Sequence, residues 1–166
     1  MPYTTESYWT IEELKKMNKA ALFGLRKAYL IFLGCIEILL AIEVILCLAT
    51  DSGAMAAVFL VTLICFPIVI IKITNYKLSK DFKTNKILQN DVTTMSFSED
   101  RLELSNGRGN SFVKYDELYK ILETDTNFYL FIAKNQAFNV IKENCQKELI
   151  TFLQNLKQEL DSKARS

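Results

Sequence analysis

Two long apolar runs limit what this chain can fold into more than any other feature of its sequence. Residues 28–49 are apolar apart from Glu37 and Glu43 and a few small residues, and residues 54–71 carry no charge. A helix needs about 20 apolar residues to cross a bilayer core, and the two runs fit that requirement. A small soluble domain has no layer that would hide two helices apolar on every side. The first run also starts too late for a signal peptide, so we expect two retained transmembrane helices.

The link between the runs, Thr50 to Gly53, contains no Lys or Arg, whereas both outer flanks are basic. The flanking residues are Lys15, Lys16, Lys19, Arg26 and Lys27 before the first run, and Lys72, Lys77, Lys80, Lys83 and Lys86 after the second. Basic residues stay on the cytoplasmic side of a membrane. We therefore expect a transmembrane helical hairpin over residues 28–73 of a multi-pass cell-membrane protein, with both termini in the cytoplasm.

Residues 1–27 form a lead-in to the first run. Thr10 and Glu13 have the spacing of a capping box, in which each side chain bonds to the backbone of the other residue. The residues that follow place Leu14, Ala21 and other apolar side chains mostly on one face, with lysines mostly off it. We expect a short cytoplasmic amphipathic helix whose apolar face lies in the headgroup region.

The chain changes character near residue 90. Short alternating segments are separated by turn residues, and Asn106-Gly107 is a strong hairpin signal. The segments are residues 92–97, 101–104, 112–115, 118–123, 128–132 and 137–141. From Cys145 to Leu160 apolar residues recur every three or four positions, which predicts a helix packed on the open end of the strands. We place this domain at residues 90–161, followed by a polar tail at residues 162–166.

The amino-acid sequence of this domain resembles that of a known family. The segments Tyr115–Tyr119 (YDELY) and Phe128–Phe131 (FYLF), followed by Lys134–Phe138 (KNQAF), resemble the YcxB-like family of bacterial membrane proteins. The resemblance implies a two-helix hairpin and a pleckstrin-homology-like domain. Such a barrel has about seven strands as a family-level expectation, so residues 2–5 are expected to add an edge strand. One departure is that Val140-Ile141-Lys142 lacks the Pro that family members often have there.

The fold class is therefore an α+β membrane protein. It consists of the two-helix transmembrane hairpin and a small antiparallel β domain of the pleckstrin-homology-like type, capped by a C-terminal helix.

The composition argues against several kinds of chemistry. The chain has no His, which removes histidine triads and histidine metal ligands. Cys35, Cys47 and Cys65 lie in the apolar runs and Cys145 lies on an apolar helix face, where thiols are inert. Gly107-Arg108-Gly109 fits a turn better than a phosphate loop. A net charge of +1 gives no sign of nucleic-acid binding. We expect no enzyme activity, no cofactor and no metal.

Two groups of residues remain as candidate sites. Glu37 and Glu43 are carboxylates inside an apolar run, each costing about 2.5–3.5 kcal/mol on insertion scales. Glu37 is expected to be protonated and to bond to Thr62, to backbone or to Glu37 of a second copy, unless it serves an ion or proton path. The second group, Lys72, Lys77, Lys80 and Lys83, sets the topology and is a candidate for contacts with anionic lipids.

These features favour a membrane-anchored, cytoplasm-facing interaction module without catalytic activity. Its partner would be a protein or a lipid of the bilayer, or a second copy of the chain, bound at strand edges or a helix groove. The alternative is a small oligomeric channel or transporter accessory that uses Glu37. Binding of an intact partner would support the first, and a proton leak that depends on Glu37 would support the second.

Overall fold

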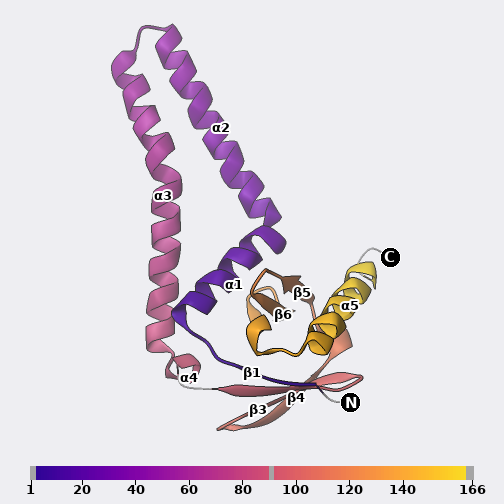
Figure 1. Cartoon of the computed structure of the whole chain (residues 1–166). Coiled ribbons are helices and arrows are strands. Elements are labelled where there is room, and N and C mark those ends of the chain that lie inside the picture. Colours follow the sequence, from indigo (N-terminus) through magenta and orange to yellow (C-terminus); the bar gives the residue numbers. More distant parts are fainter. Residues whose placement is uncertain (1–2, 90–91, 164–166) are drawn as a thin grey trace. The chain divides into compact units, whose positions relative to one another are not determined.

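The structure is a computed structural model that describes residues 3–89 and 92–163. The chain divides into two compact units (Figure 1). Residues Leu22–Asp81 form the hairpin unit, and Met1–Ala21 together with Phe82–Ser166 form the folded unit. The N-terminal segment thus belongs to the same unit as the strands near the C-terminus.

The hairpin unit consists of two helices, α2 (Lys27–Ala49) and α3 (Gly53–Thr84). Both are long and apolar enough to cross a membrane, by length and composition. The turn between them includes Asp51, whose φ of 54° is left-handed. The expected helices are therefore present, but α3 continues well past its apolar run, since no Pro or Gly interrupts the sequence from Lys72 to Thr84.

The first sheet of the folded unit is antiparallel, with the order β1-β2-β3-β4. Its strands are β1 (Tyr3–Ser7), β2 (Thr93–Phe97), β3 (Arg101–Asn106) and β4 (Gly109–Lys114). β1 is the edge strand expected from the N-terminus, although Pro2 lies outside the described residues. The β3–β4 hairpin turns at the Asn-Gly signal, where Asn106 Oδ1 accepts a bond from the Arg108 N–H at 3.0 Å.

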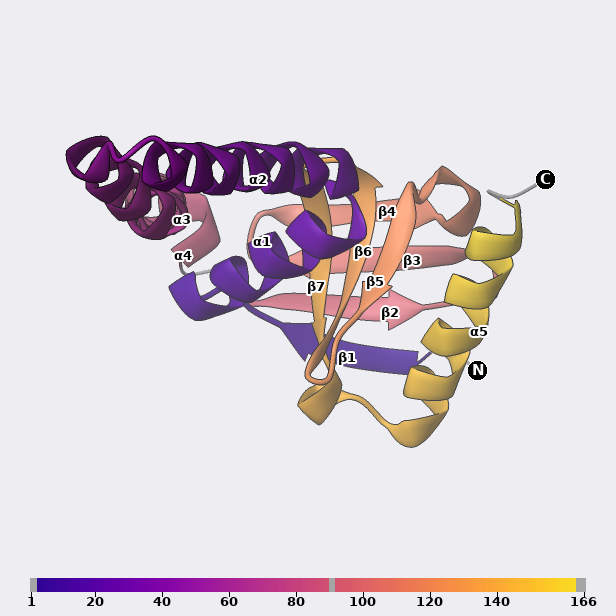
Figure 2. The same cartoon turned by 90° about the horizontal axis from the view of Figure 1, so that it is seen from above.

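The second sheet is antiparallel, with the order β5-β6-β7, and its strands cross those of the first sheet (Figure 2). The strands are β5 (Lys120–Glu123), β6 (Asn127–Ala133) and β7 (Gln136–Ile141). Short helical segments complete the unit: α4 (Lys86–Gln89), η1 (Tyr115–Glu117) and η2 (Lys142–Asn144). The C-terminal helix α5 (Lys147–Lys163) continues past the predicted domain end at residue 161.

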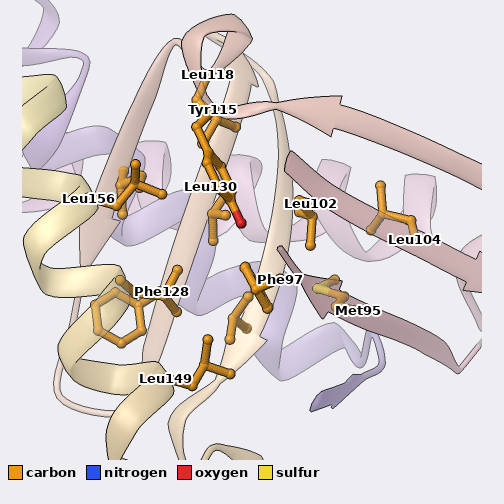
Figure 3. Close-up of a cluster of buried hydrophobic side chains, with 13 residues drawn as sticks. Met95, Phe97, Leu102, Leu104, Tyr115, Leu118, Phe128, Leu130, Leu149 and Leu156 are labelled. Carbon is orange, nitrogen blue, oxygen red and sulfur yellow. The ribbon is translucent and has the colours of Figure 1, made fainter. Parts of the chain in front are cut away.

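One hydrophobic core lies between the two sheets and α5 (Figure 3). Leu102, Phe128 and Leu130 come from the strands, and Leu149 and Leu153 come from α5; all five are 0% exposed. Burying such a side chain contributes about 1.5–3 kcal/mol. The predicted packing of the C-terminal helix against the strands is confirmed, because its apolar stripe recurs at helical spacing and meets the inward residues of the alternating strands.

The second sheet is buried on its other face as well. Tyr129 and Phe131 alternate with the core residues of β6 and are also 0% exposed. Helix α1 (Ile11–Gly24) lies across this face, where its Leu14 and Ala21 are buried (Figure 2). The expectation that this apolar face of the lead-in helix lies among lipid headgroups is therefore wrong. A sheet that is apolar on both sides needs a second cover, and α1 provides it.

Candidate functional site

A groove of about 450 Å³ opens in the folded unit between the ends of the two sheets and α1. Its lining comes from β1, α1, β2, β3, β4, β7 and the segments joining them: Ser7, Trp9, Leu14, Met17, Asn85, Thr93, Met95, Leu104, Asn106, Ser111, Asn135, Gln136, Ala137 and Phe138. None of these lining residues is charged. The groove therefore has no cation with which to hold a phosphate or another anion.

The groove combines two kinds of side chain. Trp9, Met17 and Phe138 are apolar, and Trp9 is the single Trp of the chain. Amides and hydroxyls, such as those of Asn106 and Ser111, lie beside them. Aromatic residues and Met are enriched at the centres of protein interfaces, and amide side chains match the donors and acceptors of a peptide backbone. The lining thus suits an uncharged segment with an apolar side chain.

Helix α1 carries a buried carboxylate on the side that contacts the second sheet. Glu13 is 9% exposed, and its Oε2 accepts a hydrogen bond from Asn127 Nδ2 at 2.6 Å and one from Asn139 Nδ2 at 3.5 Å. Asn127 Nδ2 also donates to Asn139 Oδ1 at 2.7 Å. Lys16 Nζ donates to Glu13 Oε1 at 2.7 Å from the solvent side. These contacts fix α1 to β6 and β7, which carry the two amides.

This network explains why only half of the expected capping box forms. Thr10 Oγ1 accepts the hydrogen bond from the Glu13 N–H at 3.1 Å, as expected. The Glu13 side chain, however, points to the sheet and not back to Thr10. Two fully buried amides on the facing sheet need an acceptor, and leaving them without one costs more than a missing surface cap.

Tyr129 is the remaining polar group near this network. Its side chain is fully buried, and its hydroxyl has no hydrogen-bond partner among the described residues. Burial raises the pKa of Tyr129, and the negative charge of Glu13 raises the pKa further. The hydroxyl of Tyr129 therefore stays protonated. We interpret this region as a structural contact between α1 and the second sheet.

A second charged cluster joins β5 to η2 and α5. Glu123 Oε1 accepts hydrogen bonds from Lys142 Nζ at 2.8 Å and from Gln154 Nε2 at 2.9 Å, and Lys157 lies 3.6 Å from Oε2. Burial pushes the pKa of Glu123 up, but the two hydrogen bonds and the lysine charges outweigh burial and bring its pKa below the ordinary value. The carboxylate is thus held in its charged form.

Glu37 and Glu43 occupy different faces of α2. Glu43 is exposed, whereas Glu37 is partly buried in a line with Leu33, Leu40, Val44 and Cys47. The less exposed residues of α3 in the hairpin follow the same steps of three and four: Ala56, Phe59, Leu63, Phe66 and Ile70. The two helices diverge from their turn (Figure 1). The two glutamates therefore do not form one site.

Thr62 is not the partner of Glu37. It is exposed, and its hydroxyl donates to the Val58 carbonyl of its own helix at 2.9 Å. This expectation is wrong because Thr62 lies off the line of partly buried residues. Pro67 offers a different acceptor: it has no N–H, so the carbonyl of Leu63 lacks its usual helical donor. Leu63 belongs to the line of less exposed residues of α3.

Lys72, Lys77, Lys80 and Lys83 are exposed on α3 beyond its apolar run. At about 100° per residue they cover an arc of roughly 140°. At about 1.5 Å per residue, Lys72 follows the apolar run directly, while Lys83 lies about 18 Å beyond its end. The headgroup layer is only about 5–8 Å deep. In a helix that crosses along the bilayer normal, Lys72 and Lys77 are thus the best placed for lipid contacts.

The described residues contain no group of three or more His, Cys, Asp or Glu that could hold a metal ion. All four cysteines are free. Cys145 is partly buried, and burial raises the pKa of its thiol, an effect that the Thr5 hydroxyl partly offsets.

The sequence reasoning missed the groove and the buried network. Asn139 gave a usable signal, because it interrupts the apolar segment Phe138–Ile141 at a position where a strand is otherwise buried. Asn127 was placed in a turn, although it begins β6. The groove had no comparable signal, because its lining comes from segments far apart in the chain.

Comparison with known proteins gives one family. The model of the YcxB-like protein family matches residues 97–153, which run from the end of β2 into α5. This part of the folded unit is similar to the YcxB-like family, and the resemblance found in the sequence is confirmed over these residues. Searches of curated proteins and of solved structures found no match.

Proposed function

We propose that the chain is a membrane-anchored interaction module without catalytic activity, whose folded unit binds a segment of a partner protein in the groove. The observation that carries this proposal is the groove itself, with its apolar and amide lining and its lack of charge. The folded unit is proposed to be pleckstrin-homology-like, supported by its four-stranded and three-stranded sheets and its C-terminal helix.

The hairpin unit is proposed to be the anchor. Its α2 has no buried residue and α3 has only Ala56, so nearly all of their apolar side chains are open to the surroundings. A patch of that size in water favours aggregation, whereas in a bilayer it is solvated. Lys and Arg flank the hairpin on both sides, and its turn contains Asp51 but no basic residue. This distribution supports a protein of the cell membrane with both termini in the cytoplasm. Lys72 and Lys77 are proposed to contact anionic lipids there.

Photo-crosslinking tests the binding role in intact membranes. A photoreactive amino acid at Met17, in the groove, should form discrete adducts with another protein. Adding Ser111→Trp should abolish the adducts, because Ser111 lines the groove and a large ring would fill it. Ser105→Trp is the matched control, since Ser105 is exposed on the neighbouring strand and does not line the groove. Adducts that persist with Ser111→Trp would contradict the proposal.

A small channel or transporter accessory built on Glu37 is the second candidate. It is favoured by the position of this carboxyl, partly buried in the hairpin and without a hydrogen-bond or ion-pair partner among the described residues. Proton flux into liposomes that contain the purified chain tests it. Glu37→Gln cannot ionise, so it should abolish flux if the residue conducts, and flux equal to that of empty liposomes would remove this candidate.

A further inference from the structure

We infer that the outer face of α1 is a contact surface for anionic lipid headgroups, which holds the folded unit against the cytoplasmic leaflet. The inference rests on the membrane anchor of the proposed function, and it concerns a different surface from the groove. It is carried by the two faces of α1, by the charges on the other outer faces of the folded unit, and by the short connection from α1 to α2.

Helix α1 has an apolar face that is occupied and a basic face that is not. Leu14 and Ala21 are buried on the side of the second sheet, which α1 crosses (Figure 2). At about 100° per residue, the roughly opposite arc of the helix holds three lysines. All three are exposed: Lys15, Lys16 and Lys19. A contact between α1 and headgroups therefore has to use these lysines, because the apolar face already packs on the sheet.

Two of the three lysines are available to an anion. Lys16 Nζ is held by Glu13 Oε1 at 2.7 Å, whereas no hydrogen bond or ion pair of Lys15 or Lys19 is found among the described residues. Residues four positions apart are neighbours on one side of a helix, so Lys15 and Lys19 present their ammonium groups together. Glu12 is the exposed acidic residue of α1, and it lies in the first turn.

The other outer faces of the folded unit carry balanced charges. The exposed charged residues of the first sheet are two acidic and two basic: Glu6, Glu103, Arg101 and Lys114. Those of α5 are also two and two: Glu148, Glu159, Lys147 and Lys163. Lys120 adds charge to the side that α1 covers, because it pairs with Phe131, whose side chain points there. An anionic surface attracts basic side chains, so it favours the side of α1 over the balanced faces.

The connection to α2 keeps this face near the membrane. From Lys19 to Gly24 the helix rises about 7.5 Å, and the three steps from Gly24 to Lys27, where α2 begins, span at most about 10.5 Å. Lys19 therefore lies within about 18 Å of the start of the proposed anchor in any arrangement of the two units. Attraction between charges acts over about 8 Å at physiological ionic strength. The connection thus brings the lysines within reach, and their charge selects the docked orientation.

A contact through lysines behaves differently from a helix whose apolar face is inserted among headgroups. Insertion of apolar side chains depends on burial, so it persists in salt and on uncharged lipids. A contact through lysines requires anionic lipids and is screened by salt. Each lysine near an anionic surface raises the docked population about fivefold. Lipid charge and salt are therefore the two variables that test the inference.

Lysine acetylation of the full chain in nanodiscs gives the first test, because both membrane faces are open to the reagent there. One set contains phosphatidylcholine alone, and the other contains equal parts phosphatidylcholine and phosphatidylglycerol. Lys15 and Lys19 should be acetylated several-fold more slowly in the anionic set, each normalised to the exposed Lys147 of α5. Salt at about 1 M, which shortens the screening length to about 3 Å, should remove the difference.

Energy transfer from Trp9, the single Trp of the chain, to a dansyl-labelled lipid headgroup gives the second test. Lys15→Gln combined with Lys19→Gln should lower transfer in anionic nanodiscs to the level seen in uncharged ones. Lys114→Gln combined with Lys147→Gln is the matched control, since it removes the same charge from exposed positions on other faces and should leave transfer unchanged. Equal losses for the two pairs would overturn the inference.

Entry of the chain into nanodiscs separates this inference from the proposed function. If the chain enters, and Lys15 and Lys19 are acetylated equally with both lipids or stay protected in high salt, the inference is overturned while the anchor stands. If the chain does not enter, the anchor fails and the inference fails with it. The photo-adducts at Met17, which test the groove, have no bearing on these outcomes.

Discussion

The two units of this chain differ in how far their apolar side chains are buried. The folded unit hides Leu102, Phe128 and Leu153 completely, whereas α2 of the hairpin unit has no buried residue. The folded unit thus carries its own core, whereas the apolar side chains of α2 lack one. Membrane insertion of the hairpin, as proposed above, would give α2 and α3 the apolar contacts that the core gives to the folded unit.

The same contrast appears in two glutamates. Glu13 is buried in the folded unit and accepts hydrogen bonds from Asn127, Asn139 and Lys16. Glu37 is partly buried in the hairpin, and no hydrogen bond or ion pair of its carboxyl is found among the described residues. A charged carboxylate in an apolar medium is costly without partners. We therefore expect Glu13 to serve as a hydrogen-bond acceptor in the folded unit, whereas Glu37 needs a partner that the described residues do not show.

The largest effect is expected at the core of the folded unit. Leu153→Asp places a charge without a partner where the side chain is 0% exposed, and it should cost at least about 3 kcal/mol of unfolding free energy. Thermal unfolding of the full chain in detergent, followed by Trp9 fluorescence, should lose its cooperative transition. Asn155→Asp, exposed on the same helix, is the control. An unchanged transition for Leu153→Asp would mean that α5 is not docked.

The next effect is expected at Glu13. Glu13→Ala removes the carboxylate acceptor of two buried amides, and it should lower the unfolding free energy by about 1–3 kcal/mol. The matched change Glu12→Ala, at an exposed neighbour, should be nearly silent. Chemical denaturation of both variants, with the same fluorescence signal, gives the comparison. Equal losses for the two would show that the buried network does not hold α1 to the sheet.

A smaller effect is expected in the hairpin. We expect protonated Glu37 to donate to the Leu63 carbonyl that Pro67 leaves without a helical donor. Glu37→Gln should be nearly silent, and Glu37→Leu should cost about 0.6–2 kcal/mol. Combined with Pro67→Ala, which restores the backbone donor, Glu37→Leu should cost measurably less.

A double-mutant cycle of hairpin unfolding in bicelles measures this coupling. Glu43→Leu, at an exposed position of the same helix, should not couple to Pro67→Ala. If the cost of Glu37→Leu is the same with and without Pro67→Ala, the Leu63 carbonyl is not the acceptor.

The smallest effect is a pH dependence at Glu123. The pKa of Glu123 in the folded protein lies below the ordinary value of a glutamate, so its contribution to stability is present above that ordinary value and is lost as the pH falls through the lowered pKa. Glu123→Gln should lower the unfolding free energy at pH 7 by up to about 1 kcal/mol, and the difference should vanish in acid. Glu143→Gln, on exposed η2, is the control. A difference that persists unchanged in acid would contradict this origin.

The sequence predicted the elements better than their packing. The two apolar runs, the Asn106-Gly107 hairpin and the C-terminal stripe depend on local periodicity, and each is present in the structure. The burial of Glu13 and the docking of α1 depend on Asn127 and Asn139, which lie more than a hundred residues away. Long-range polar contacts leave little periodic signal, which is why Glu13 was assigned only to a helix cap.

The candidate sites also divide into those that local sequence predicts and those that depend on long-range packing. Lys72, Lys77, Lys80 and Lys83 were found from their position after an apolar run, and they are exposed there. The distance between Lys72 and Lys83 follows from the continuous helix α3. The sequence alone did not predict that this helix extends to Thr84. The groove around Trp9 arises only when the sheets are assembled.

Accessibility labelling in intact cells tests the central claim, that the hairpin crosses the membrane and holds the folded unit on the cytoplasmic side. In a chain with its native cysteines replaced by Ala, Ser52→Cys in the turn should react with a membrane-impermeant thiol reagent added outside. Ser162→Cys, near the end of α5, should react only after the cells are permeabilised. Labelling of position 162 from outside, with position 52 protected, would contradict the account.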